Sequence, residues 1–141
     1  MLVILLPEQV VKYWEEIRYY IEAALPVQMQ RGYDMNRVLE HIVGGLLLVA
    51  LLTDRGGIIV AVFTLRVQED RMLGVKNLVI VTGYASRMLA KSEVDDMLMT
   101  AKKLAESQQC KGILFYTDKE GAVQLFKQSG GSEHKFIMWE V

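Results

Sequence analysis

The chain has 141 residues, of which 52% are hydrophobic, and 16 basic residues nearly balance 17 acidic ones, giving a formal net charge of −1. This length suits one packed domain over residues 1–141. The small net charge provides no strong positive field, so we expect no nucleic-acid partner. The most apolar run, Ile42–Leu52, is too short to cross a bilayer, so we expect no membrane partner. A lone cysteine, Cys110, cannot form an internal disulfide, which favours a reducing, cytoplasmic location.

The first part of the chain predicts one strand followed by two helices. Met1–Leu6 is apolar but lacks the basic residues of a signal peptide, so it is predicted to be a strand. From Pro7, apolar residues recur at helical spacing until Pro26 ends the pattern. Asp34 is a suitable N-cap for a second helix that runs to about Ile42.

The first predicted helix has more aromatic surface than one buried stripe requires. Its aromatic residues are Tyr13, Trp14, Tyr19 and Tyr20. Because they lie on opposing faces, they cannot all contact the same core. We therefore expect part of this surface to meet a protein partner or a second copy of the chain.

The middle of the chain predicts three strands. Leu46–Thr53 and Ile58–Val67 are rich in β-formers, and Asp54–Gly57 between them supplies the glycines of a tight turn, so they predict a hairpin. A polar connection over Gln68–Lys76 leads to a third predicted strand, Asn77–Thr82.

The second half predicts helices alternating with strands. Ser92 is a suitable N-cap for a helix that runs to Gln109. Gly112–Tyr116 follows as a strand, and the crossover between them implies that it pairs in parallel with Asn77–Thr82. A helix over about Lys119–Gln128 and a last strand, Lys135–Val141, complete the order β-α-α-β-β-β-α-β-α-β.

A candidate anion site lies where the third predicted strand passes into the following helix. The loop between them is Arg87-Met88-Leu89-Ala90-Lys91-Ser92. The free N–H groups at the start of a helix and the positive end of its dipole attract anions. Glu93, Asp95 and Asp96 in the first turn act against this, because their carboxylates repel a phosphate. Ser92 is therefore either an ordinary cap or a ligand residue.

This segment resembles the second half of a GNAT-type acyl-CoA N-acyltransferase. In that family an Arg/Gln-x-x-Gly-x-Gly/Ala loop wraps the pyrophosphate of acyl-CoA, and an Ala-x-x-Leu-Tyr-x-x-x-Gly helix supplies a tyrosine beside the thioester. The resemblance implies an α/β (α+β) fold with a mixed, mainly antiparallel sheet flanked by helices. It also implies that acetyl-CoA, if bound, contacts the strand end at Val81 and Thr82 and the loop residues Arg87, Ala90, Lys91 and Ser92.

The chain departs from the family pattern at two places. The loop is Arg-x-x-Ala-x-Ser, so Ala90 and Ser92 place side chains where glycine would let the backbone approach a phosphate. The tyrosine position is Phe126, which has no proton to give to a departing thiolate. The residues after Gly131 have room for one strand where the family usually has two.

Other candidate residues each have a structural alternative. Tyr84 is a weak candidate for a replacement proton donor, or a packed loop aromatic. Glu69 and Asp70 are candidate bases, or ordinary loop carboxylates. Arg87 either pairs with phosphate or lies exposed before the helix. Two isolated histidines, His41 and His134, predict no metal site.

Two functions are open. Small GNAT-like proteins without intact motifs occur in tailed-phage genomes, including virion components, and this degenerate chain resembles them. The first hypothesis is a non-catalytic binding or assembly module, for which a phage virion component is one form. The alternative is an active acetyl-CoA-dependent N-acetyltransferase that acts on an amine.

Overall fold

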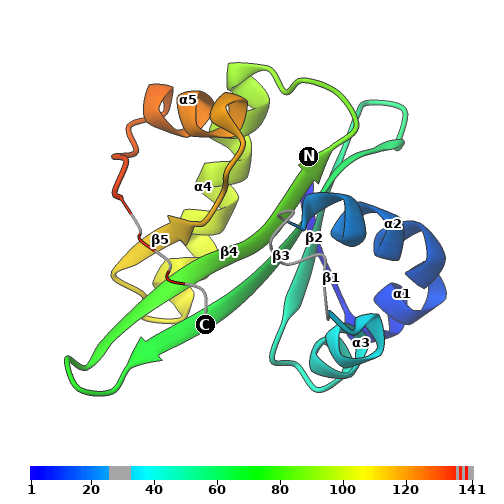
Figure 1. Cartoon of the computed structure of the whole chain (residues 1–141). Coiled ribbons are helices and arrows are strands. Elements are labelled where there is room, and N and C mark those ends of the chain that lie inside the picture. Colours follow the sequence, from blue (N-terminus) through cyan, green and yellow to red (C-terminus); the bar gives the residue numbers. More distant parts are fainter. Residues whose placement is uncertain (26–32, 136, 138, 140–141) are drawn as a thin grey trace.

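The protein forms one five-stranded sheet with helices on both faces, as seen in a computed structural model that describes residues 1–25, 33–135, 137 and 139 (Figure 1). The strands are β1 (Leu2–Leu5), β2 (Leu48–Thr53), β3 (Ile59–Asp70), β4 (Val75–Ala85) and β5 (Gly112–Phe115). They lie in sequence order across the sheet, and all neighbours are antiparallel except β4 and β5, which are parallel. The predicted mixed, mainly antiparallel sheet is therefore confirmed.

The helices form two groups on opposite sides of the sheet (Figure 1). The first group consists of α1 (Pro7–Lys12), α2 (Trp14–Ala24) and α3 (Met35–Val43), and the second of α4 (Lys91–Ser107) and α5 (Glu120–Gln128). Side chains alternate along β3, so that Val62 packs under the first group and Phe63 under the second. Both sides of the sheet are thus buried, because each strand supplies apolar residues to both faces.

Local signals in the sequence place several elements correctly. Asp34 caps α3 as predicted, since its Oδ1 accepts a hydrogen bond of 2.9 Å from the Asn36 N–H. The β2–β3 hairpin is also confirmed. Asp54 Oδ1 accepts from the N–H groups of Gly56 and Ile58, and Gly57 takes a positive φ of 78° that an L-residue with a side chain rarely adopts.

Other predicted bounds are wrong. The single helix from Pro7 is two helices, because Tyr13 leaves the helical conformation at φ −109° and ψ 23°. The predicted polar connection, residues 68–76, belongs mostly to strands β3 and β4. Glu69 pairs with Lys76 across the hairpin, and Asp70 Oδ1 accepts from the N–H groups at the turn, so polar residues extend the ladder.

The end of the chain differs from the prediction as well. The predicted strand over residues 135–141 contains Phe136, Met138, Glu140 and Val141, which lie outside the described residues. The described residues of that segment, Lys135, Ile137 and Trp139, are not in a strand. The observed order through α5 is β-α-α-α-β-β-β-α-β-α.

Candidate functional site

The pairing between the two parallel strands, β4 and β5, ends about halfway along β4. Their last paired residues are Ile80 and Phe115, where β5 ends, whereas β4 continues to Ala85. Figure 1 shows the chain leaving the end of β5 and running to α5. The second half of β4 therefore pairs with β3 on one side and has no paired β5 residue on the other.

A bulge in β4 lies at the point where the strands part. Thr64 of β3 pairs with Thr82, but the next residue, Leu65, pairs with Ile80, so Val81 has no opposite residue. The Thr64 hydroxyl accepts the Thr82 N–H at 3.1 Å, and the two hydroxyls are hydrogen-bonded at 2.6 Å. Both threonines are buried. The N–H of Thr82, a residue predicted to contact acyl-CoA, is thus bonded inside the sheet, to β3.

Aromatic rings pack on the α4 side of the sheet, beside the half of β4 that does not pair with β5. The rings of Phe115 and Phe126 have centroids 5.0 Å apart. A Cβ placed on Gly83 would lie 2.8 Å from Phe63 and 3.3 Å from Phe115. Phe115 therefore reaches from β5 to the backbone of β4, and the position of the family's tyrosine, Phe126, presents an apolar ring that packs against it.

The loop before α4 pairs its own donors with a carboxylate. Arg87 donates from both terminal nitrogens to both oxygens of Glu93, at 2.8 and 3.0 Å. The Ala90 N–H donates to Glu93 Oε1 at 3.0 Å. This doubly bonded, charge-assisted arrangement is the one that arginine makes with an external carboxylate or phosphate. Two of the groups predicted to hold pyrophosphate are thus bound to Glu93.

The next cation in the loop is also paired. Lys91 Nζ donates to Asp95 Oδ2 at 2.7 Å, and the Ser129 hydroxyl donates to Asp95 Oδ1 at 2.9 Å. Asp95 thereby joins the first turn of α4 to the end of α5. Both ion pairs are partly exposed to solvent.

These pairings change the protonation behaviour of the carboxylates. The hydrogen bond from Arg87, followed in size by that from the Ala90 N–H, lowers the pKa of Glu93 from its ordinary value of 4.5 to about 2. The hydrogen bonds from Lys91 and then Ser129 lower the pKa of Asp95. Both side chains therefore carry negative charge at neutral pH.

Known structures share this arrangement of strands and helices, although no protein-family model and no curated protein sequence matches the chain. An aminoglycoside acetyltransferase from an uncultured soil metagenomic sample superposes with a TM-score of 0.75 at 11% identity, covering 100% of this chain and 94% of its own. A ribosomal-protein-alanine N-acetyltransferase from Brucella melitensis biovar Abortus has a TM-score of 0.69 at 9% identity, with coverages of 100% and 99%.

A predicted acetyltransferase from Clostridium acetobutylicum, crystallised with acetyl-CoA, has a TM-score of 0.67 at 13% identity, covering 99% of this chain and 95% of its own. The chain has the GNAT acetyltransferase fold. The resemblance stated from the sequence is therefore confirmed at the level of the fold.

In this GNAT fold, Ser92 does not cap α4. The helix begins at Lys91 with Ala90 as N-cap, so Ser92 is its second residue. The reason is Glu93, which as the third helical residue reaches back to the Ala90 N–H, as in one half of a capping box. The spacing of Glu93 after Ala90 is the signal that could have placed this cap, but alanine at the cap position concealed it.

Tyr84 lies within β4 and not in a loop after the strand. Its ring meets Tyr20 of α2 edge-on with centroids 5.9 Å apart, while the Tyr20 hydroxyl donates to the Ile59 carbonyl at 3.2 Å. The packed-aromatic alternative describes its position. Its role as a proton donor stays a prediction.

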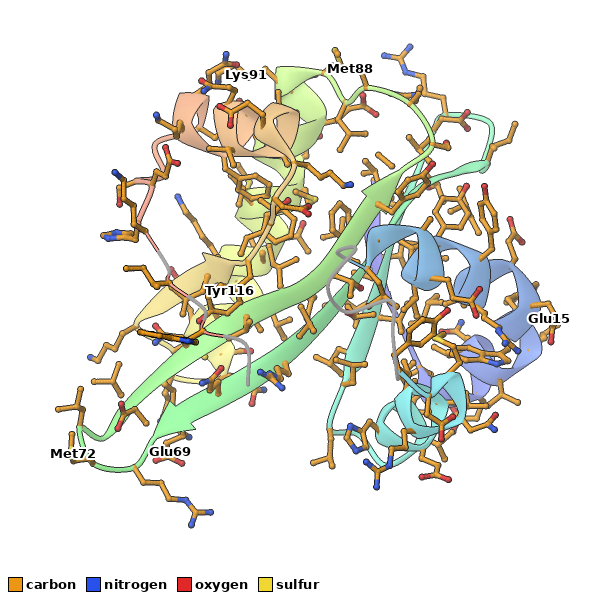
Figure 2. All side chains as sticks on the ribbon, viewed as in Figure 1. Glu15, Glu69, Met72, Met88, Lys91 and Tyr116 are labelled. Atoms are coloured by element: carbon orange, nitrogen blue, oxygen red, sulfur yellow. The ribbon has the colours of Figure 1, made fainter. Side chains whose placement is uncertain are left out.

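The two candidate bases lie far from the loop. Glu69 is near the turn of the β3–β4 hairpin, at the opposite end of the molecule from Lys91 and Met88 (Figure 2). Its neighbour Asp70 uses Oδ1 to accept the N–H groups of Met72 and Leu73. Neither carboxylate lies near the point where the pairing of β4 with β5 ends.

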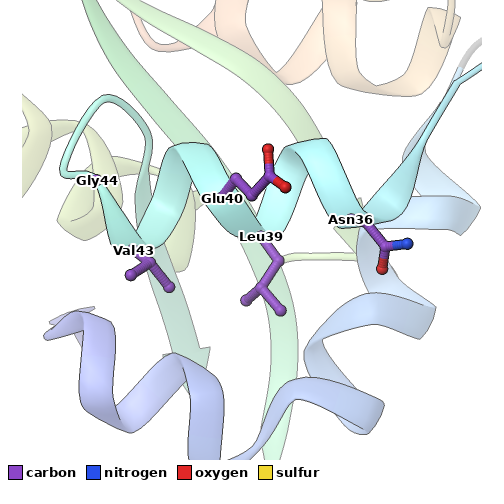
Figure 3. Close-up of a pocket in the computed structure, with 5 residues that line it drawn as sticks. All are labelled: Asn36, Leu39, Glu40, Val43 and Gly44. Atoms are coloured by element: carbon purple, nitrogen blue, oxygen red, sulfur yellow. The ribbon is translucent and has the colours of Figure 1, made fainter.

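A shallow hollow follows one face of α3, lined by Asn36, Leu39, Glu40, Val43 and Gly44 (Figure 3). Within the described ranges, no group of three or more His, Cys, Asp or Glu side chains could hold a metal ion. The same part of the chain contains no helix long and apolar enough to span a bilayer.

Proposed function

We propose that this protein is a non-catalytic binding or assembly module built on the GNAT fold. The observation that supports this most strongly is that donors on four of the six residues predicted to contact acyl-CoA are already paired within the protein. Arg87 and the Ala90 N–H bind Glu93, Lys91 binds Asp95, and the Thr82 N–H binds Thr64.

The electrostatics of these pairings disfavour an anionic cofactor. A pyrophosphate that entered the loop would meet the charged carboxylates of Glu93, in the first turn of α4, and of Asp95, two residues further along. It would also have to break the two-point bond between Arg87 and Glu93. Both steps cost free energy, because like charges repel and the displaced carboxylate loses its partner.

The side chain at the position of the family's tyrosine supports the same proposal. Phe126 packs against Phe115 and has no hydroxyl to protonate a thiolate. The general-acid contribution, roughly 10²–10⁴-fold in enzymes that use one, would therefore be missing at this position.

Partner binding would use surface that the fold leaves exposed. Tyr13 and Tyr19 on α1–α2 are 48% and 63% exposed, and neither belongs to the buried cluster beneath those helices. Exposed aromatic side chains are frequent anchors of protein interfaces. A protein partner or a second copy is the proposed occupant, and a phage virion is one setting in which such a module would assemble.

The alternative is an acetyl-CoA-dependent N-acetyltransferase that acts on an amine. The end of the β4–β5 pairing at Ile80 and the bulge at Val81 favour it, because they leave backbone of β4 without a β5 partner. The structural neighbour from Clostridium acetobutylicum was crystallised with acetyl-CoA.

One experiment separates the two. Thermal unfolding is measured with and without millimolar acetyl-CoA, and acetyl transfer is assayed on an aminoglycoside and on a peptide with a free N-terminal amine. The module predicts no change in Tm and no transfer. A ligand present at about 100 times its Kd would add roughly 2.7 kcal/mol of stability, so a rise in Tm together with transfer would establish the enzyme instead.

The proposal of a binding module also predicts a positive result, which is association of the chain with itself or with a protein partner. Light scattering coupled to size-exclusion chromatography should show self-association or a complex, and Tyr19→Ser should weaken it. Gln124→Ser on α5, far along the chain, is the matched surface control. A monomer that transfers acetyl groups would contradict the proposal.

A further inference from the structure

The Glu93 carboxylate makes the contacts that a bound anion would make in the loop before α4. Its two oxygens receive both terminal nitrogens of Arg87, and one of them also receives the Ala90 N–H. The carboxylate therefore combines a forked guanidinium contact with a backbone contact at the start of α4. An external phosphate would need the same two donors.

The geometry points to an autoinhibitory role for Glu93: its carboxylate occupies the loop in place of an anionic ligand and keeps Arg87 and the Ala90 N–H from binding one. This inference rests on the proposed function, in which the loop no longer holds a cofactor, and it names the residue responsible. We call the Arg87–Glu93–Ala90 arrangement the latch.

The latch is exposed to solvent, so an external anion can displace the Glu93 carboxylate from Arg87. The side chains of Arg87 and Glu93 are 48% and 25% exposed, so neither charge is locked in the core. Exposed ion pairs of this kind contribute little to stability, which means that breaking the latch need not unfold the protein.

The neighbouring carboxylate provides a matched control. Asp95 belongs to the same first turns of α4 and carries the same charge, but its partners are Lys91 and Ser129. Removing the charge of Asp95 changes the electrostatic potential at the loop without freeing Arg87 or the Ala90 N–H. A difference between the two positions therefore isolates the latch from a general charge effect.

The test is the affinity for coenzyme A, measured by isothermal titration calorimetry on the full chain. Glu93→Gln should bind at least roughly tenfold more tightly than the unaltered protein, a ratio that corresponds to about 1.4 kcal/mol. The amide that this substitution introduces keeps an oxygen for the Ala90 N–H, so the start of α4 is preserved. Glu93→Ala, which also removes the carboxylate, should show the same gain.

Two further variants complete the design. Asp95→Asn should gain less affinity than Glu93→Gln, because it removes one charge and frees Lys91 but leaves Arg87 and the Ala90 N–H bound to Glu93. The double variant Arg87→Ala, Glu93→Gln should lose the gain, because the freed guanidinium is then absent. Circular dichroism of each variant verifies that the fold is intact.

The outcomes distinguish the latch from the module. If the unaltered protein does not bind coenzyme A and either no Glu93 variant gains affinity or Asp95→Asn gains as much as Glu93→Gln, the latch is overturned while the module stands. If the unaltered protein already binds coenzyme A and Glu93→Gln binds at least tenfold more tightly, the latch holds and the non-binding module fails. Equal, tight binding of coenzyme A by the unaltered protein and by Glu93→Gln would overturn both the latch and the module.

Discussion

At the scale of single residues, the bulge in β4 is held by a polar contact inside an apolar sheet. Thr64 and Thr82 are the two buried polar side chains of the described residues. Their hydroxyls satisfy each other, and Thr64 also accepts the Thr82 N–H that the irregular ladder directs toward it. The two threonines are not equivalent, since the Thr64 hydroxyl has two partners and the Thr82 hydroxyl has one.

This asymmetry makes a prediction. Thr64→Val leaves both the N–H and the hydroxyl of Thr82 without a partner, which should lower the free energy of unfolding by about 1–3 kcal/mol. Thr82→Val should cost less, because Thr64 can still accept the backbone N–H at position 82. Urea denaturation of the two variants checks this, and an equal or reversed order would argue against the role given to Thr64.

Gly83 is a second residue at which packing decides the outcome. A Cβ there would come within 2.8 and 2.9 Å of the ring of Phe63, which is only 6% exposed. Gly83→Ala should therefore destabilise the protein by about 1–3 kcal/mol through overpacking. Gly121→Ala on α5 is the control, since a Cβ there meets nothing within 4 Å and alanine favours a helix by up to about 1 kcal/mol. Thermal unfolding that lowered Tm equally for both would contradict the prediction.

At the scale of elements, the start of α4 shows how one helix turn can satisfy its own binding groups. The sequence indicated a helix N-terminus, an arginine before it and three acidic residues in its first turns. It did not indicate that Glu93 would receive both Arg87 and the Ala90 N–H, because that depends on how the loop returns toward the helix.

The ion pair predicts a specific pH dependence. The pKa of Glu93 is lowered in the folded state to about 2 from 4.5, so its stabilising contribution is complete above pH 4.5 and is lost as the pH falls toward 2. The difference in Tm between the unaltered protein and Glu93→Gln should therefore shrink as the pH falls through this window. A difference that stayed constant over the same range would show that the carboxylate charge contributes nothing to folding.

The bounds of an element could be predicted where they depend on residues close together in the sequence. The prediction was wrong where they depend on residues that meet only in the folded chain. The caps and turns at Asp34 and Asp54 use atoms within four residues and were predicted. The length of β3 and β4 was not, because Glu69 and Lys76 look like loop residues until they face each other across a ladder. The break at Tyr13 was missed because apolar spacing continues through it.

At the scale of the whole molecule, one sheet carries two apolar layers. Ile17 of α2 packs with Val62 on one face, and Leu78 of β4 packs with Phe63 on the other. Adjacent residues of β3 thus belong to opposite layers. Loss of either layer should disturb the strand that both share, so we expect the chain to unfold as one domain.

This expectation can be measured with one substitution in each layer. Ile17→Ala and Leu78→Ala should each lower the free energy of unfolding by about 2–5 kcal/mol. In a Trp139→Phe background, Trp14 fluorescence follows the α1–α3 side, and far-UV circular dichroism follows the whole fold. The two transitions should coincide in both variants. Separate transitions after Leu78→Ala would indicate two domains.

The fold class, the hairpin and the position of the loop before α4 could be read from the amino-acid sequence, because periodicity, turn residues and motif spacing act over short stretches of chain. The bulge of β4 at Val81, the contact of Thr64 with Thr82 and that of Asp95 with Ser129 could be seen only in the folded protein. Those two contacts join residues 18 and 34 positions apart. They depend on strand register and helix packing, which are set by the whole folded chain and not by any one segment.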